Sequence, residues 1–223
     1  MHVTLIFMAV LMGVVAWWLL KQSVNTRPWE AHAHQGPDED FSGRSLHLPN
    51  ASIGLFVFLA VVTSLFALFI SAYTMRMELG DWRPLPDPNL LWLNTGLLIF
   101  SSIALQWAYI ATGRDQVKTA RKALLVGGFF AFAFMAGQMI AWQQMVEAGY
   151  YANTNPANAF FYLITGTHAL HLLGGLVAWG RTTVKLLSGS EMAAIRMSVE
   201  LCAVYWHFLL IIWVILFGLM LST

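Results

Sequence analysis

Two stretches near the C-terminus decide the fold: residues 160–175 read FFYLITGTHALHLLGG, and residues 200–213 read ELCAVYWHFLLIIW. Each belongs to an apolar run long enough to cross a hydrocarbon core of about 30 Å. Both also carry ionisable side chains, which cost roughly 3 kcal/mol each at the centre of a bilayer unless they find partners. Those side chains are therefore expected either to bond to neighbouring helices or to serve a function.

The composition is that of an integral membrane protein. The chain has 223 residues, of which 58% are hydrophobic and only 10% are charged. Its formal net charge of +1 gives no indication of a nucleic-acid partner. Apolar runs of membrane length recur, so the sequence predicts an all-α fold with six transmembrane helices. The predicted spans are 2–20, 51–74, 90–112, 123–146, 158–180 and 197–221.

Basic residues fall mainly in alternate connections, which predicts an orientation in the membrane. Only Arg76 and Arg83 lie on the opposite side from the rest. Because Lys and Arg favour the cytoplasmic side, both termini are expected to be periplasmic, in a bacterial inner membrane. The predicted domains are an N-terminal helix at 1–24, a polar cytoplasmic linker at 25–50 and a five-helix membrane domain at 51–223. The basic residues of the alternate connections are Lys21, Arg27, Arg44, Arg114, Lys118, Arg121, Lys122, Arg181, Lys185 and Arg196.

The polar residues of the last two spans share helix faces. Thr165, His168 and His171 are spaced by three residues and form one stripe, and Glu200 and His207 lie seven residues apart on one face. Since the two spans are consecutive, we expect these five residues to form a polar cluster between the helices, in which imidazoles and the carboxylate satisfy one another. Three further residues could extend this network: Gln138, Tyr205 and Trp206.

Three interpretations of the cluster remain open from the residues alone. The first is structural hydrogen bonding, the second is proton handling or binding of a lipid head group, and the third is ligation of a metal or haem. A b-type haem would need histidines on different helices at matched depth, which His168 and His207 could provide. Cys202 is the only cysteine, so a cysteine metal cluster is excluded. The sequence contains no recognised motif for catalysis or metal binding. The chain is therefore expected to act as a membrane scaffold.

At these residues the sequence resembles subunit III of the haem–copper terminal oxidases, the cytochrome c oxidase subunit 3 family, in its bacterial form. The resemblance covers about residues 51–221 and depends on two C-terminal motifs. The first motif runs from Phe160 or Phe161 through Thr165, Gly166, His168, His171 and Gly175, and the second comprises Glu200, Tyr205, Trp206, His207, Phe208 and Trp213. Val62 and Leu210 stand where mitochondrial members carry carboxylates, so roles of those carboxylates are not carried over.

The resemblance implies an accessory subunit of a proton-pumping oxidase that reduces oxygen to water. In that family the haems and copper belong to subunits I and II, which would be the partners. Subunit III has no redox centre, packs beside subunit I and holds phospholipid. Two related or rival functions stay open: the accessory subunit of a nitric oxide reductase, which is similar over the same motifs, and a b-type membrane cytochrome that uses His168 and His207.

Overall fold

The structure is a computed structural model that describes residues 50–85, 89–188 and 192–222. Within these residues it contains α2 (Asn50–Met77), α3 (Asn89–Gly113), α4 (Val117–Glu147), α5 (Pro156–Leu187) and α6 (Met192–Leu221). All five are long and apolar enough to cross a membrane. The five C-terminal spans are therefore confirmed as helices. The predicted first span at 2–20 and the predicted linker at 25–50 lie outside the described residues, except for Asn50, which is the first residue of α2.

The helices extend beyond the predicted spans at their more polar ends. Helix α4 begins at Val117 rather than at 123, and α5 continues to Leu187 rather than ending at 180. The extra turns carry basic residues such as Lys118 and Arg181. Hydropathy located the part of each helix that suits lipid, whereas the backbone hydrogen-bond ladder continues into the charged turns.

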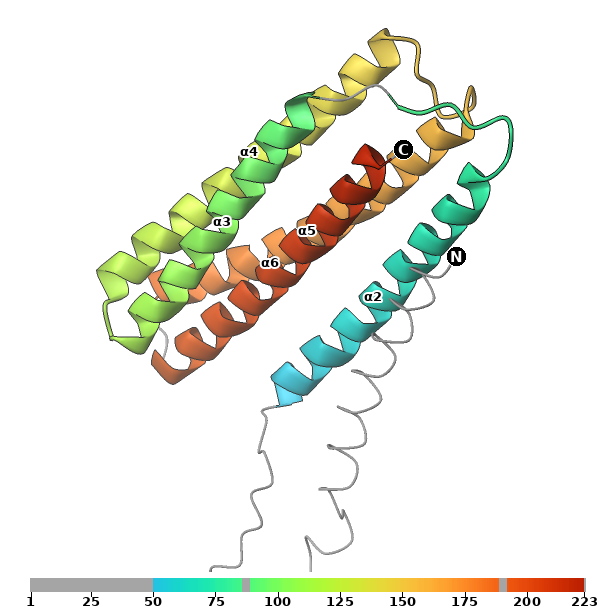
Figure 1. Cartoon of the computed structure of the whole chain (residues 1–223). Helices are drawn as coiled ribbons and strands as arrows, with labels where there is room; N and C mark the ends of the chain where they lie inside the picture. The colour runs from blue at the N-terminus through green and yellow to red at the C-terminus, as the bar shows by residue number, and fades with distance from the viewer. Residues whose placement is uncertain (1–49, 86–88, 189–191, 223) are drawn as a thin grey trace, which may run out of the picture. The chain divides into compact units, whose positions relative to one another are not determined.

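The chain divides into two units, residues 1–61 and 62–223. The second unit contains the end of α2 and all of α3–α6. Helices α3, α4, α5 and α6 form a closed ring of contacts in which α3 packs on α4, α4 on α5, α5 on α6 and α6 on α3 (Figure 1). The end of α2 contacts α5 through rings: Phe66 lies against His168 and His171, and Tyr73 lies against Phe160.

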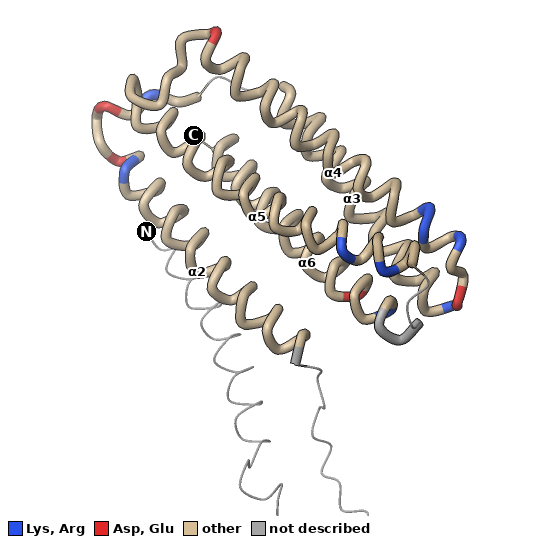
Figure 2. Tube along the Cα trace, turned by 180° about the vertical axis from the view of Figure 1, so that it is seen from behind, with Lys and Arg blue, Asp and Glu red and all other residues tan. Residues whose placement is uncertain are grey.

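The outer surface of the bundle is apolar. Phe129, Leu170 and Val184 have exposed fractions of 68%, 66% and 64%. An apolar surface of this extent would be a liability in water and is suited to lipid. The described Lys and Arg residues gather mostly at the end where α3 joins α4 and α5 approaches α6 (Figure 2). The orientation of the chain in the membrane stays a prediction.

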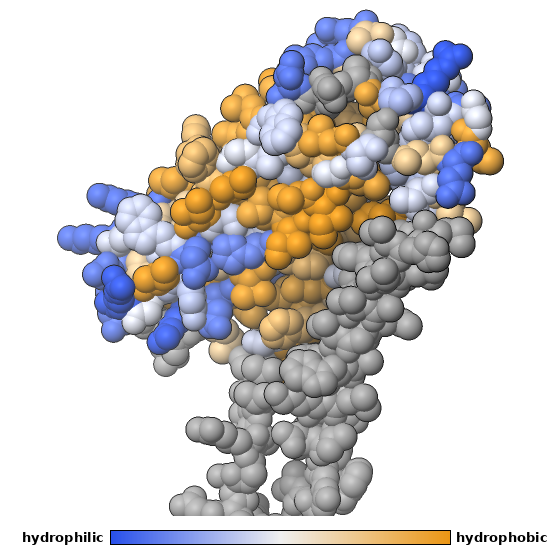
Figure 3. All heavy atoms as spheres, in the orientation of Figure 1, coloured by the Kyte–Doolittle hydropathy of each residue, from blue (hydrophilic) through white to orange (hydrophobic). Residues whose placement is uncertain are grey.

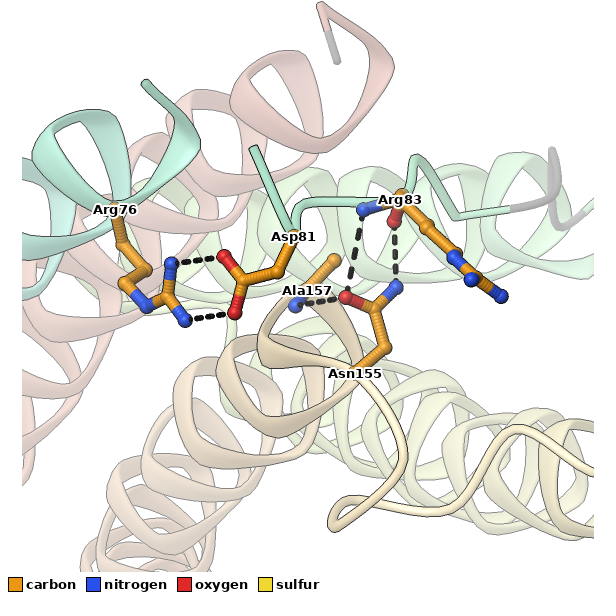
Figure 4. A network of polar contacts seen from close by, with 5 residues as sticks. All are labelled: Arg76, Asp81, Arg83, Asn155 and Ala157. Carbon is orange, nitrogen blue, oxygen red and sulfur yellow. Dashed lines mark hydrogen bonds and ion pairs between the residues drawn. The ribbon is translucent and has the colours of Figure 1, made fainter. Parts of the chain in front are cut away.

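The opposite end is held by two polar contacts in the connections (Figure 4). After α2, the guanidinium of Arg76 donates two hydrogen bonds to the carboxylate of Asp81, at 2.6 and 2.5 Å. The side chain of Asn155 accepts from the backbone N–H of Ala157 at 3.2 Å, which caps the start of α5. Its amide also donates to the carbonyl of Arg83 at 2.6 Å. One Asn side chain thus caps α5 and ties the α2–α3 connection to it.

Candidate functional site

His207 lies near the middle of α6 and bonds to α3. Its Nε2 lies 2.9 Å from the side-chain oxygen of Gln106, and its Nδ1 hydrogen-bonds to the hydroxyl of Ser102. Since an amide oxygen can only accept, Nε2 carries a proton. Both ring nitrogens are satisfied by side chains of α3. A second contact between the same helices runs from the Trp213 indole N–H to the Thr95 hydroxyl, at 2.9 Å.

His168 lies on α5 in a different environment. It is fully buried, and neither ring nitrogen has a hydrogen-bond partner in the described part of the chain. Its ring is surrounded by Phe66, Phe134 and Trp213, with centroid distances of 6.4, 6.0 and 5.1 Å. The residue serves here as a flat ring in an aromatic box that joins four helices.

The contact between α5 and α6 is made mainly by packing. Gly175 faces Tyr205 and Trp206, and a Cβ at position 175 would lie only 2.7 and 2.8 Å from their rings. Glycine at position 175 therefore permits the close approach of the two helices, whereas Gly174 faces open space. The hydroxyl of Tyr205 donates to the backbone carbonyl of His171 at 2.9 Å.

Thr165 and Gln138 connect α4 with its neighbours. The Thr165 hydroxyl accepts from the Trp142 indole N–H at 3.0 Å and donates to the carbonyl of Phe161 at 2.6 Å. The Gln138 side-chain oxygen accepts from the Asn94 amide at 3.3 Å. Gln138 and Asn94 are both essentially inaccessible to solvent. These polar groups also join helices to one another.

The five residues predicted as one cluster are thus distributed over several contacts. The structure brings His168 close to His171 and Thr165 only along their own helix, while His207 turns toward α3. Glu200 is exposed, so the carboxylate does not satisfy the imidazoles as expected. The physical reason is the position of Glu200 along α6. It precedes His207 by seven residues, or about two helical turns, and so lies nearer the basic end of the helix, where its side chain can reach water.

Sequence reasoning missed the polar face of α3. Thr95, Ser102 and Gln106 are spaced by seven and four residues, so they share one helix face, and they supply every partner of His207 and of the Trp213 indole. The spacing test that linked His168 to His171 would have found this face. The search for ionisable residues does not find this face, because Ser, Thr and Gln carry no charge.

The contacts do not favour a haem between His168 and His207. Both nitrogens of His207 are engaged by α3 side chains, and His168 is enclosed by three aromatic rings. Among the described residues no group of three or more His, Cys, Asp or Glu side chains could hold a metal ion. The polar groups can therefore bond helices together.

Comparison with known proteins gives one consistent family. The sequence pattern of the cytochrome c oxidase subunit III family matches residues 3–222. The cytochrome c oxidase subunit 3 of Thermostichus vulcanus is 29% identical over 194 residues, which cover 85% of this chain and 90% of that protein. A probable cytochrome c oxidase subunit 3 of Mycobacterium leprae is 33% identical over 186 residues, or 78% of this chain and 88% of the relative.

A fourth comparison concerns a longer protein. A haem–copper oxidase subunit I+III of Aeropyrum pernix is 27% identical over 176 residues, which are 74% of this chain and 22% of that protein. Members of the matched family carry no redox centre and no catalytic centre of their own. With five membrane-length helices in its described part and a match over nearly its whole length, this multi-pass membrane chain belongs to the cytochrome c oxidase subunit III family.

Proposed function

We propose that the chain is the accessory, non-redox subunit III of a haem–copper terminal oxidase that reduces oxygen to water and pumps protons. In this role it stabilises the catalytic subunit I, assembles with subunits I and II and holds phospholipid. The haems and copper belong to its partners. The family match and the fused subunit I+III of Aeropyrum pernix support this assignment.

One observation carries the proposal: the polar groups within the membrane bond helix to helix. His207 bonds to Ser102 and Gln106, the Trp142 indole bonds to Thr165, and the Trp179 indole donates to the backbone carbonyl of Leu124 at 2.9 Å. In hydrocarbon a polar group without a partner is costly, so these pairs fix the helix arrangement. Such an arrangement suits a rigid scaffold that presents apolar faces to other subunits and to lipid.

The test is purification of the intact complex. The chain carries an affinity tag, is expressed in its own cell and is extracted from membranes with a mild detergent. We expect it to bring down haem–copper subunits I and II together with phospholipid, with haem and copper in proportion to subunit I. Recovery of the polypeptide alone, free of any haem–copper subunit, would contradict the proposal.

The same preparation distinguishes the rivals. A nitric oxide reductase would differ in the identity of the catalytic subunit, in its haem and copper content and in the gas it consumes. For the b-type cytochrome, the deciding observation is a Soret band that stays with this polypeptide after the partners are removed. His207→Ala serves as a further check: weakened assembly with an unchanged oxygen-site spectrum is expected if the histidine binds helices together.

A further inference from the structure

An open groove of about 460 Å³ runs between α3 and α6 at the depth of His207. Its floor carries three polar side chains, Ser102, Gln106 and His207, and its walls are apolar. Figure 3 shows hydrophilic surface set within the hydrophobic belt on the face formed by α3 and α6. A polar spot on a lipid-facing surface is unusual, because bilayer interiors offer it no hydrogen-bond partner.

The groove offers hydrogen-bond donors that the protein does not use. Gln106 gives its side-chain oxygen to His207, which leaves the two N–H groups of its amide. In the described residues no acceptor for that amide nitrogen occurs, and Gln106 is only half buried. Two N–H donors facing hydrocarbon are costly. An occupant of the groove that supplies an oxygen acceptor would remove this cost.

Depth restricts what that occupant can be. Ser102 lies about 20 Å from the start of α3, and His207 lies about 18 Å from Ile195 near the start of α6, at 1.5 Å per residue. Both positions fall near the middle of a hydrocarbon core of about 30 Å. Gln106 follows Ser102 by four residues, so it lies about 6 Å nearer the end of α3 and still inside that core. A phospholipid head group and its ester carbonyls stay at or outside the edge of the core, and its acyl chains have no acceptor. An acceptor from a group that resides inside the hydrocarbon core therefore fits best.

The shape of the wall indicates a helix. Along α3 the groove is lined by Ile99, Ile103, Gln106 and Ile110, which are spaced by four, three and four residues. This spacing shows that the four residues share one face of α3. Such a face can receive the side chains of a second helix between residues three and four apart. The stripe extends about 16 Å along the helix. A compact ligand would occupy only part of that length.

We propose that this groove is the docking site for a transmembrane helix of the haem–copper catalytic subunit, with an oxygen acceptor on that helix bonded to the Gln106 amide. The proposal rests on the proposed function, which names that subunit as the partner. The fusion of subunits I and III in the Aeropyrum pernix relative supports a lasting association of these two chains. Ser102 and His207 act as positioning residues, since His207 bonds to the Gln106 oxygen and Ser102 bonds to His207.

The first experiment is crosslinking in the intact complex. Ile103 on the groove wall and Val177 on α5 are each 59% exposed, and Val177 does not line the groove. Each is replaced in turn by a benzophenone amino acid, and the crosslinked peptides are identified after illumination in native membranes. We expect at least tenfold more crosslinking to a membrane-spanning peptide of the catalytic subunit from position 103 than from position 177. Equal or lower yield from 103, or crosslinks there only to lipid or a quinone, overturns the proposal.

The second experiment removes the donors. In Gln106→Leu the catalytic subunit should dissociate more readily during detergent titration, by roughly three- to twentyfold in apparent affinity, as for one interhelical hydrogen bond in a membrane. Gln143→Leu is the matched control, because Gln143 is exposed and bonds only to Glu147 on its own helix. Dissociation equal to that of the control overturns the proposal. Should Gln106→Leu fail to accumulate, the crosslinks from Ile103 still decide.

The two experiments also separate this proposal from the proposed function. If a haem–copper subunit copurifies with the unmodified chain but crosslinks no better from 103 than from 177, the chain is a subunit III that docks elsewhere. If no haem–copper subunit copurifies, both proposals fail together.

Discussion

Helix α6 contacts its two neighbours by different means. Toward α3 it uses side-chain hydrogen bonds, from His207 to Ser102 and Gln106. Toward α5 it relies mainly on shape, because the rings of Tyr205 and Trp206 fill the space left by Gly175, with one hydrogen bond from the Tyr205 hydroxyl to the His171 carbonyl. The α3 contact specifies which polar groups must face each other, and the α5 contact specifies how closely two backbones must approach. Substitutions that affect one contact should leave the other intact.

The largest effect is expected at the shape-based contact. In Gly175→Leu the new side chain would meet Tyr205 and Trp206 at once, and overpacking of this kind costs about 1–3 kcal/mol or more. The thermal unfolding midpoint of the purified protein should fall by several degrees. Gly174→Leu is the matched control, since position 174 faces open space. Equal midpoints for the two variants would show that α5 and α6 do not meet at Gly175.

A smaller loss of stability is expected at the hydrogen-bonded contact between α3 and α6. The same substitution, His→Phe, made separately at positions 207 and 168, tests this expectation. His207→Phe removes two hydrogen bonds and leaves Ser102 and Gln106 unpaired, which should cost about 1–2 kcal/mol. His168→Phe removes no hydrogen bond and keeps a flat ring among rings, so its cost should stay under about 1 kcal/mol. Unfolding midpoints in one detergent compare them. A larger loss for His168 would reverse the assignment of roles.

These two histidines also show what sequence could predict. Membrane length and hydropathy correctly predicted five helices, and helical spacing correctly predicted that His168 faces the bundle interior. Spacing within a helix gives the direction of a side chain relative to its own axis only. It does not tell which neighbour occupies that direction, and the expected pairing of His207 with α5 was assigned by adjacency in sequence. The structure instead bonds His207 to α3, the helix three spans earlier, although α6 packs on α5 as well.

The buried amides illustrate a second limit. Gln138 was predicted as a possible member of the polar network, and it is buried against Asn94, which sequence reasoning had not connected with it. The pair joins residues 44 apart in sequence, and no local pattern encodes such a distance. Amide pairs between helices can be found from sequence only once the packing order α3–α4–α5–α6 is known.

A further prediction concerns the second hydrogen bond between α3 and α6. Thr95→Val keeps the shape of the side chain but removes the acceptor for the Trp213 indole N–H. Single interhelical hydrogen bonds in membranes contribute about 0.6 kcal/mol, so a small fall in the unfolding midpoint is expected. Thr182→Val is the control, because the Thr182 hydroxyl bonds only to the carbonyl of Ala178 in its own helix. A drop in the control that matches Thr95→Val would assign the effect to the loss of any threonine hydroxyl.

The smallest effect is expected where a polar pair lies in water instead of in the membrane. Hydrogen bonds from Arg76 hold the pKa of Asp81 below its ordinary value. Because the folded carboxyl binds its proton at lower pH than the unfolded one, the pair stabilises the connection above about pH 4, and the contribution is lost as the pH falls through the folded pKa. Both groups are solvent-accessible, so salt should weaken the pair further. Asp81→Asn should therefore lower the unfolding midpoint slightly at pH 7. The difference from the unmodified chain should shrink as the pH falls below about 4 and vanish only below the folded pKa of Asp81, and it should also vanish in about 0.5 M salt. Asp115→Asn is the control, since Asp115 has no ion-pair partner among the described residues.

The loss of stability from His207→Phe, inside the membrane, should persist in the same salt. If salt abolished that loss as well, the His207 site would be open to water, and the contrast between the two kinds of polar contact would fail.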